Sequence, residues 1–420
     1  RLSLVGSEMC IRDRSYILAN YKKIFRQPAA NLKYPFLCPG AGYAQELWGW
    51  DAYWEALSLR YAFENYKEEV ALRAEIDRET AAEYMRGCVL DFLDAQEEDG
   101  FTPIMLSGDG LFEGFFHNEY LKGTPQNQHM PFLCQSALNA SEFSGSFDWF
   151  DIQKLKKYMR YFEQTQFDKK SGLFFWKNDI MVGIDNNPTV YYRPAGSSAD
   201  VFLNCFMYLE YLALAKILRR LCDGDAEAQL KKAEALKAAI NTEMWDERDG
   251  IYYSQDIGVY KTDCAVKGVA LHSGLAPHWT AFPLKIRFWG CFLPMYAGIC
   301  SEERAERMCA HLTANDDLLA EYGIRTLAKN EKMYSLVKSG NPSNWLGAIW
   351  VVANYCVYKG LVRYNKTELA EQMRSATLKL LNKALDERGD FFESYHPDTG
   401  EQFLHAGFLS HNLPVIEMLK

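Results

Sequence analysis

The stretch SSADVFLNCFMYLEYLALAKILRRL, residues 197–221, predicts a helix that is apolar on nearly every side. Its apolar positions recur at helical spacing and include Val201, Phe202, Phe206, Leu209, Leu212, Ile217 and Leu221. A helix that is hydrophobic all round is buried, so we expect this one to lie inside the fold. Residues 226–241 instead carry a single apolar stripe, which is typical of an outer helix. That stripe consists of Leu230, Ala233, Leu236 and Ile240.

The same alternation of inner and outer helices recurs elsewhere in the chain. Residues 345–363 are largely apolar, whereas residues 367–386 and 81–92 have the spacing of amphipathic helices. Short strand signals follow glycine turns at residues 173–176 and 251–253. We therefore predict an all-α fold with short β-hairpins in its loops. No linker interrupts the pattern, so residues 15–420 are expected to form one domain. The alternation of inner and outer helices predicts that this domain is a closed ring of helical hairpins. A generic multi-helix protein is the alternative.

The first fourteen residues, RLSLVGSEMCIRDR, show neither a helical nor a strand period. They have basic ends but lack the apolar segment of a signal peptide. The segment resembles a translated sequencing adaptor, so we expect residues 1–14 to be non-native. The natural N-terminus would then be missing, and a signal peptide could have been lost with it.

Composition excludes several classes of protein. Of the 420 residues, 48% are hydrophobic and 24% are charged, as in ordinary soluble domains. The formal net charge of -9 disfavours nucleic acid and anionic membranes as partners, and no apolar run is long enough to cross a bilayer. The aromatic content of 14% suits either sugar binding or a large core. Oligomeric state stays open.

The 11 cysteines are scattered, without a CxxC pair, which argues against a zinc site and against disulfides. We expect reduced core thiols and a cytoplasmic location, with Cys205, Cys222, Cys291 and Cys356 as examples. GxSxG, HExxH, P-loop and dinucleotide-binding motifs are all absent, so neither a cofactor nor a metal is expected. His405 and His411 are the closest histidines that could act together. The chemistry is therefore expected to rest on carboxylates.

Three loop-like segments place carboxylates among aromatic residues. PGAGYAQELWGWDAYW, residues 39–54, carries Asp51 between tryptophans, and sugars stack on indoles while carboxylates accept their hydroxyls. A first-turn charge beside core tryptophans explains this segment equally well. In SGLFFWKNDIMVGIDNNPTVYYRP, residues 171–194, Asp185 could act as a general acid or could merely close an Asx-turn. In FFESYHPDTGE, residues 391–401, Glu393 could activate water or be a chance charge beside an exposed turn.

Taken together and in order, seven segments resemble the glycoside hydrolase clan of trehalases and of family 63. They are ELWGWDAYW, QNQHMPF, GIDNNP, SADVFLNCFMYLEYLALAKI, EYGIRTLA, NWLGAIWVVANY and ESYHPDTGE. The resemblance runs from about residue 32 to the C-terminus. The length is most similar to the short bacterial branch of mannosylglycerate and glucosylglycerate hydrolases and α-glucosidases.

This resemblance implies an (α/α)6 barrel and hydrolysis with inversion at the anomeric carbon. By motif, Asp185 matches the general acid of the family and Glu393 its general base. The implied contacts to a small carbohydrate substrate are Tyr43, Trp48, Trp50, Asp51, Gln128, Trp345 and Trp350. Arg193, like Arg325, is a candidate for binding a substrate carboxylate or a structural ion-pair partner. Asn187, Ala348 and His411 depart from the usual Ser, Pro and Trp of the family.

The sequence therefore predicts an inverting hydrolase of an α-glucoside or α-mannoside. Inversion requires two carboxyl groups roughly 6.5–9.5 Å apart, so the fold must bring Asp185 and Glu393 to one mouth. A trehalase is an alternative, although its glycine-rich stretch near the C-terminus is absent. An inactive carbohydrate-binding relative and a sugar epimerase with paired histidines are two further alternatives. The sequence decides neither glucose against mannose nor the identity of the aglycone.

Overall fold

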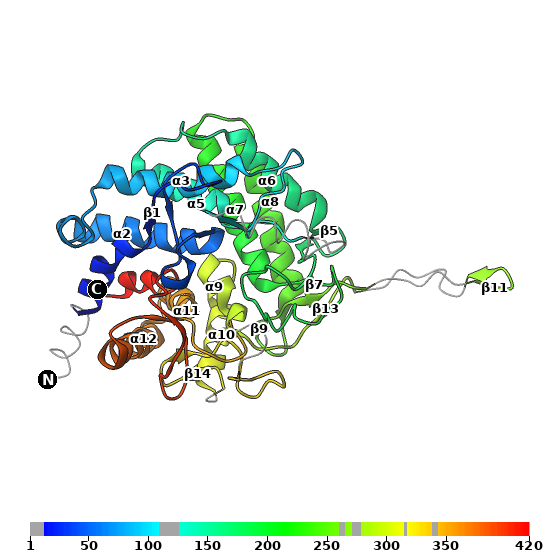
Figure 1. The fold of residues 1–420 in the computed structure, drawn as a ribbon. Helices are drawn as coiled ribbons and strands as arrows, with labels where there is room; N and C mark the ends of the chain where they lie inside the picture. Colours follow the sequence, from blue (N-terminus) through cyan, green and yellow to red (C-terminus); the bar gives the residue numbers. More distant parts are fainter. Residues whose placement is uncertain are drawn as a thin grey trace.

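Long α-helices supply most of the regular structure in the computed structural model, which describes residues 12–108, 126–259, 265–270, 279–314, 317–337 and 343–419. A first helix covers residues 12–20. The later ones are α2 (Gly49–Ala74), α3 (Arg78–Asp94), α5 (Leu133–Ser144), α6 (Ile152–Thr165), α7 (Val201–Arg220), α8 (Ala226–Ala239), α9 (Leu293–Ala297), α10 (Glu302–Thr313), α11 (Val351–Arg363) and α12 (Thr367–Arg388). Their arrangement is shown in Figure 1.

The predicted inner and outer helices are confirmed. Helix α7 is buried along almost its whole length, and α8 packs along it. By length and hydropathy α7 could cross a membrane, but 83% of its apolar window is buried inside the protein, which marks it as a core helix. Helices α11 and α12 form a second pair of the same kind. Helix α11 begins only at Val351, because residues 345–350, expected to be helical, form a loop.

The buried helices pack against one another in chain order. Helix α2 packs on α5, α5 on α7, α7 on α9, and α9 on α11. The short 3-10 helix η6 (Leu413–Met418) then contacts both α11 and α2. The last turn of the chain therefore lies beside its first long helix, as the red and blue segments show in Figure 1.

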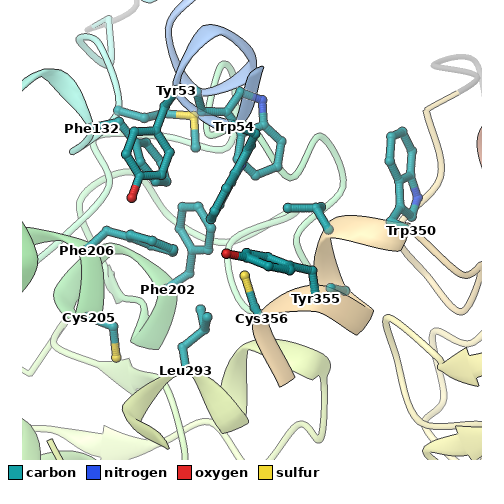
Figure 2. Close-up of a cluster of buried hydrophobic side chains, with 14 of the residues drawn as sticks. Tyr53, Trp54, Phe132, Phe202, Cys205, Phe206, Leu293, Trp350, Tyr355 and Cys356 are labelled. Atoms are coloured by element: carbon teal, nitrogen blue, oxygen red, sulfur yellow. The ribbon is translucent and has the colours of Figure 1, made fainter. Parts of the chain in front are cut away.

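An aromatic core fills the space between these inner helices. Figure 2 shows Trp54 of α2, Phe206 of α7 and Tyr355 of α11 directed toward one another. The Trp54 ring lies 6.2 Å from that of Phe206 and 5.9 Å from that of Tyr355, and all three side chains are buried. Trp50 lies one turn before Trp54 and contacts Phe202 at 5.9 Å. Trp50, in the first turn of α2, thus lies at the edge of this aromatic core.

The strands are short and mostly form isolated antiparallel pairs. The predicted strands near residues 173 and 251 are confirmed as β6 and β9. The pairs are β1 (Phe25–Arg26) with β2 (Phe36–Leu37), β3 (Glu46–Trp48) with β4 (Met105–Ser107), β5 (Phe167–Asp168) with β6 (Leu173–Phe174), β8 (Trp245–Asp246) with β9 (Ile251–Tyr252), β11 (Ala265–Val266) with β12 (Val269–Ala270), β14 (Leu319–Ala320) with β15 (Gly323–Ile324), and β16 (Phe392–Tyr395) with β17 (Gln402–Ala406). Strand β10 (Gln255–Asp256) lies between β7 (Ser198–Ala199) and β13 (Phe282–Pro283).

One cysteine differs from its expected position. Cys205, Cys291 and Cys356 are buried free thiols, as expected, but Cys222 is exposed. Helix α7 ends at Arg220, and Cys222 then adopts a left-handed φ of 56° in the turn toward α8. The turn directs its side chain outward, so the apolar neighbours in the sequence were misleading. Of the segment expected to be non-native, the structure describes residues 12–14, and that expectation stays a prediction.

Candidate active site

One open cavity collects side chains from the three segments that the sequence singled out. Asp51, Asp185 and Glu393 all lie on its wall, although the last two are 208 positions apart in the chain. The described residues that line it are Pro39, Tyr43, Trp48, Trp50, Asp51, Ile104, Met130, Met181, Gly183, Asp185, Ser343, Trp345, Trp350, Glu393, Phe408 and His411. Three carboxyl groups therefore face one space bounded by aromatic rings.

The start of α2 is held against a buried histidine. Strand β3 leads directly into Gly49, where an added Cβ would lie 2.1 Å from the His129 ring. Only glycine allows this approach, which places Trp50 and Asp51 in the first helical turn at the cavity. Burial lowers the pKa of His129 to about 4, so this ring is a neutral packing partner at ordinary pH.

Asp51 is a buried carboxyl group in a weakly polar setting. The Ser410 hydroxyl donates a hydrogen bond to its Oδ1 at 2.6 Å, and His411 Nε2 lies 3.3 Å from the same oxygen. Burial, opposed by the Ser410 hydrogen bond and assisted by the charges of Glu393 and Asp185, raises the pKa of Asp51 to about 7. Burial also lowers the pKa of His411 to about 3. The imidazole is therefore neutral, and its contact with Asp51 is not an ion pair.

The loop that carries Asp185 is anchored on both following residues. Asn186 donates to Asn344 Oδ1 at 3.0 Å and accepts from the Trp345 backbone at 2.7 Å. Asn187 donates to Asp200 Oδ2 at 3.0 Å and closes an Asx-turn by accepting from the Thr189 backbone at 3.0 Å. The turn expected of the D-N-N-P sequence is thus present, and Asn187 closes it.

The carboxylate of Asp200, at the start of α7, is the buried anchor of this loop. It accepts hydrogen bonds from Asn187, Thr189 and Ser254 and from the indole of Trp176 at 3.3 Å. A buried carboxylate that satisfies four donors holds them in one arrangement, because all of them but the Thr189 hydroxyl, which also lies 2.9 Å from Asn187 Oδ1, would otherwise lose this acceptor. Gly183 brings the same loop against Met130, since an added Cβ there would lie 2.3 Å from the Met130 side chain.

Glu393 lies on β16 and is only 3% exposed. Its Oε1 accepts a hydrogen bond from the Tyr43 hydroxyl at 3.0 Å and lies 2.5 Å from His405 Nδ1. Burial, and next the Glu393 carboxylate, raise the pKa of the Tyr43 phenol above its ordinary value, so this phenol stays a donor. The neighbouring Tyr395 pairs with Ile349 through two backbone hydrogen bonds of 2.8 and 2.9 Å. These bonds join the hairpin to the loop that carries the tryptophans.

Trp345 and Trp350 form a stacked pair on the cavity wall. Their ring centroids lie 4.1 Å apart with an interplanar angle of 8°, and the Trp350 indole donates to the Asn344 carbonyl at 2.9 Å. Trp50 lies 5.8 Å from Trp345, and His411 packs edge-on to Trp50 at 4.6 Å. A flat aromatic wall beside carboxyl groups suits a sugar ring, which has apolar faces and a rim of hydroxyls.

Two expected substrate contacts do not line the cavity among the described residues. Gln128 is fully buried and donates to the Tyr158 carbonyl at 3.3 Å. Arg193 binds Asp256 at 2.5 Å and Ser198 at 3.0 Å, and Arg325 binds Asp398 at 2.5 Å. Both arginines thus make the structural ion pairs that were the alternative. The roles predicted for Gln128 and Arg193 in binding substrate stay predictions.

Three other carboxyl groups of the segments quoted above lie away from the cavity. Asp179 accepts from the Tyr192 backbone at 3.1 Å, and Glu321 pairs with Lys379 on an exposed surface. Glu401 is exposed in the turn between β16 and β17. None of the three is among the described residues of the cavity wall.

Three polar neighbours of Asp51 and Glu393 were not predicted from the sequence. Ser410 and His411 reach Asp51, and His405 reaches Glu393. The HPDTG turn contained a usable signal for His405, because a hairpin folded at that turn places residues after Gly400 opposite Glu393. No comparable local signal pointed to Ser410 or His411, which follow the hairpin in a turn.

Comparisons with known proteins identify the family of this chain. A family model described as the mannosylglycerate hydrolase MGH1-like glycoside hydrolase domain matches residues 45–411. An uncharacterized protein of Borreliella burgdorferi is 26% identical over 75% of this chain and 60% of its own length. Mannosylglycerate hydrolase of Rubrobacter radiotolerans is 25% identical over 48% of this chain and 39% of its own. Mannosylglycerate hydrolase MGH1 of Selaginella moellendorffii is 31% identical over 26% of this chain and 20% of its own.

The matches thus cover 60% or less of the length of these curated relatives. Among solved structures, a mannosylglycerate hydrolase of glycoside hydrolase family 63 from Thermus thermophilus, in complex with glucose, has a TM-score of 0.64 at 17% identity, over 98% of this chain and 99% of that one. Neutral trehalase from Saccharomyces cerevisiae has a TM-score of 0.61 at 17% identity, over 92% of this chain and 73% of that one. These two likenesses concern the fold. Since the family model covers most of the sequence, this chain belongs to the mannosylglycerate hydrolase MGH1-like glycoside hydrolases.

Proposed function

We propose that this protein hydrolyses an α-mannoside or α-glucoside of a small molecule with inversion, with Asp185 as the general acid and Glu393 as the general base. The observation that carries the proposal is that these two residues, 208 positions apart, lie on the wall of one aromatic cavity. Family membership supports the same reaction class.

For the fold we propose an (α/α)6 barrel. The inner elements α2, α5, α7, α9, α11 and η6 pack against their neighbours in order, and η6 returns to α2. In such a ring, alternate loops open on the same rim, which accounts for the meeting of residues from the start of α2, the loop before α7 and the β16–β17 hairpin. The structural likeness to a family 63 enzyme and to a trehalase supports this topology.

In the proposed reaction, Asp185 protonates the glycosidic oxygen as the bond to the anomeric carbon breaks. Glu393 takes a proton from a water molecule, whose oxygen attacks the opposite face of that carbon. Trp345 and Trp350 would carry the apolar face of the sugar, and Asp51 would contact its hydroxyls. The half-buried position of Asp185 suits a proton donor that must reach a leaving group, and the deep burial of Glu393 limits access to a positioned water.

For the substrate we propose a glycoside of glycerate. The relatives from Rubrobacter and Selaginella are named mannosylglycerate hydrolases, and so is the structural match from Thermus thermophilus. Among the described residues, neither Arg193 nor Arg325 reaches the cavity, so glycerate would be held there by other donors.

A hydrolysis panel tests this function. Mannosylglycerate, glucosylglycerate, trehalose, kojibiose and nigerose are incubated with the wild-type protein and with the Asp185→Asn and Glu393→Gln variants, and released sugar is quantified. We expect turnover of a glycosylglycerate by the wild type and its loss in both variants. Turnover of trehalose alone would support the trehalase alternative, and no turnover of any substrate would favour an inactive carbohydrate-binding relative.

A further inference from the structure

His405 reaches the proposed general base from the solvent side. Its side chain is 52% exposed, whereas that of Glu393 is 3% exposed, and the two are joined by the 2.5 Å contact between Nδ1 and Oε1. Among the described residues, Glu393 lines the cavity and His405 does not. Glu393 thus lies between the cavity on one side and His405 on the other.

An irregular hairpin creates this contact. Phe392 pairs with Ala406 and Ser394 pairs with Phe403, so a bulge in β17 opposes Glu393. Within the bulge, Leu404 adopts a left-handed φ of 66°, a conformation that costs a non-glycine residue energy. A regular register would place a single residue opposite Glu393, whereas the bulge supplies two and turns His405 toward the carboxylate.

The imidazole ring is also supported on its other faces. It lies edge-on to the Tyr43 ring, with centroids 5.6 Å apart and an angle of 83°. It packs over Gly42, where an added Cβ would lie 3.6 Å from its Cδ2 atom. Tyr43 and His405 therefore contact each other as well as the same oxygen of Glu393.

The chemistry of the base determines which atoms donate. A general base must be ionised, and an ionised carboxylate only accepts hydrogen bonds. The Tyr43 hydroxyl and His405 Nδ1–H must then both donate to Oε1. The imidazole therefore carries a proton on Nδ1, the nitrogen that faces the carboxylate. Both contacts of Glu393 with described residues fall on Oε1, which leaves Oε2 to take the proton from water.

We propose that His405 is a positioning residue of the reaction: its Nδ1–H, together with the Tyr43 hydroxyl, occupies Oε1 of Glu393 and so presents Oε2 to the attacking water. This inference deepens the proposed function and rests on Glu393 being the base. His405 acts through Glu393 and touches no reacting atom. A side chain that supplies the same donor at the Nδ1 position should replace it.

Two substitutions separate hydrogen-bond donation from packing. His405→Asn retains an N–H donor near the Nδ1 position, whereas His405→Phe retains a ring without a donor. We expect His405→Phe to lower kcat about 10–100-fold, a part of the 10²–10⁴ that a general base contributes, with little change in KM. His405→Asn should recover most of that loss. His396→Phe, in the turn of the same hairpin and without a contact to Glu393, is the matched control and should keep wild-type kcat.

A second background tests whether His405 acts through Glu393. In Glu393→Ala, added azide should attack the anomeric carbon in place of water, so that the C–O bond breaks, a C–N bond forms, and Asp185 protonates the leaving oxygen. Adding His405→Phe to this variant should leave the azide-dependent rate unchanged, because no carboxylate remains to be positioned.

The outcomes distinguish this inference from the proposed function. If Glu393→Gln loses activity while His405→Phe keeps wild-type kcat, the role of His405 is wrong and the proposed base stands. A loss in His405→Phe that Asn does not recover, or an equal loss in the Glu393→Ala background with azide, also overturns it. If Glu393→Gln itself retains the wild-type rate, the assignment of the base is what fails. Thermal melting of each variant shows whether a loss of kcat follows from unfolding.

Discussion

The two halves of the proposed catalytic pair are held in opposite ways. The acid loop, residues 184–190, is fastened by buried amides and by one buried carboxylate, Asp200, with four donors. The base hairpin, residues 391–406, carries Glu393, whose carboxylate is held by Tyr43 from outside the hairpin and by the half-exposed His405 within it. The position of the acid thus depends on the folded core, whereas the position of the base depends on two donors near the surface. Substitutions behind the acid should cost stability, and substitutions behind the base should cost rate.

The largest effects on rate should come from substituting the acid and the base themselves. Substrates with different leaving groups should tell the two roles apart. Asp185→Asn cannot donate a proton, so it should lower kcat about 10²–10⁴-fold on a natural glycoside but much less on a glycosyl fluoride, whose leaving group needs little protonation. Glu393→Gln should lose a similar factor on both substrates, because water must still be activated. Steady-state rates on the two substrates measure this. Equal losses of the two variants on the fluoride would contradict the assignment of acid and base.

Next in size are effects behind the acid. Asp200→Ala removes a carboxylate from four buried donors, and each buried group without a partner costs about 1–3 kcal/mol. We expect the free energy of unfolding to fall by about 3 kcal/mol or more, measured by urea denaturation, and kcat to fall as the loop loosens. For comparison, we expect His405→Phe to lower kcat while changing the free energy of unfolding little. If the two variants showed the same ratio of lost stability to lost rate, the contrast between the two regions would be wrong.

The smallest effect concerns Asp51, whose pKa is raised in part by the charges of Glu393 in the base hairpin and Asp185 in the acid loop. Burial raises its folded-state pKa to about 7 from an ordinary value of 3.8, so its ionisation opposes folding. This cost is absent below about pH 4, grows up to about pH 7 and is constant above it. Asp51→Asn should therefore gain about 1–3 kcal/mol of unfolding free energy at pH 8 and almost none at pH 4, while losing substrate affinity. Denaturation curves at the two pH values test this, and an equal gain at both would exclude charge as the cause.

Much of this molecule could be predicted from local patterns. The inner and outer helices follow from hydrophobic spacing. Helix α7 is apolar on nearly every side and is buried along most of its length, whereas α8 has one apolar stripe and buries far fewer residues. Trp50, Asp51, Asp185 and Glu393 lie in aromatic and glycine-rich segments that drew attention to them, and the resemblance to the family then assigned their roles. The structure places all four on one cavity.

Other features depend on contacts that no local pattern encodes. Gln128 lies in a segment whose Met130 lines the cavity, but its own side chain turns back to the Tyr158 carbonyl. Arg193 forms an ion pair with Asp256, which is 63 positions further along the sequence. The HPDTG turn indicates a hairpin opposite Glu393, but not the bulge in β17 that brings His405 to the carboxylate, because a regular hairpin would have a different register. The D-N-N-P turn was correctly recognised, yet only the fold shows that Asn187, bound to Asp200, closes it.

The stereochemistry of the first product tests the central claim most directly. If Asp185 and Glu393 act as acid and base on opposite faces of the sugar, water attacks once and the configuration inverts. Time-resolved proton NMR during hydrolysis of an α-glycoside by the wild-type protein should show the β-anomer first, followed by slow mutarotation to the α-anomer. Release of the α-anomer first would indicate a covalent double displacement, and it would contradict the role of Glu393 as a base that activates water.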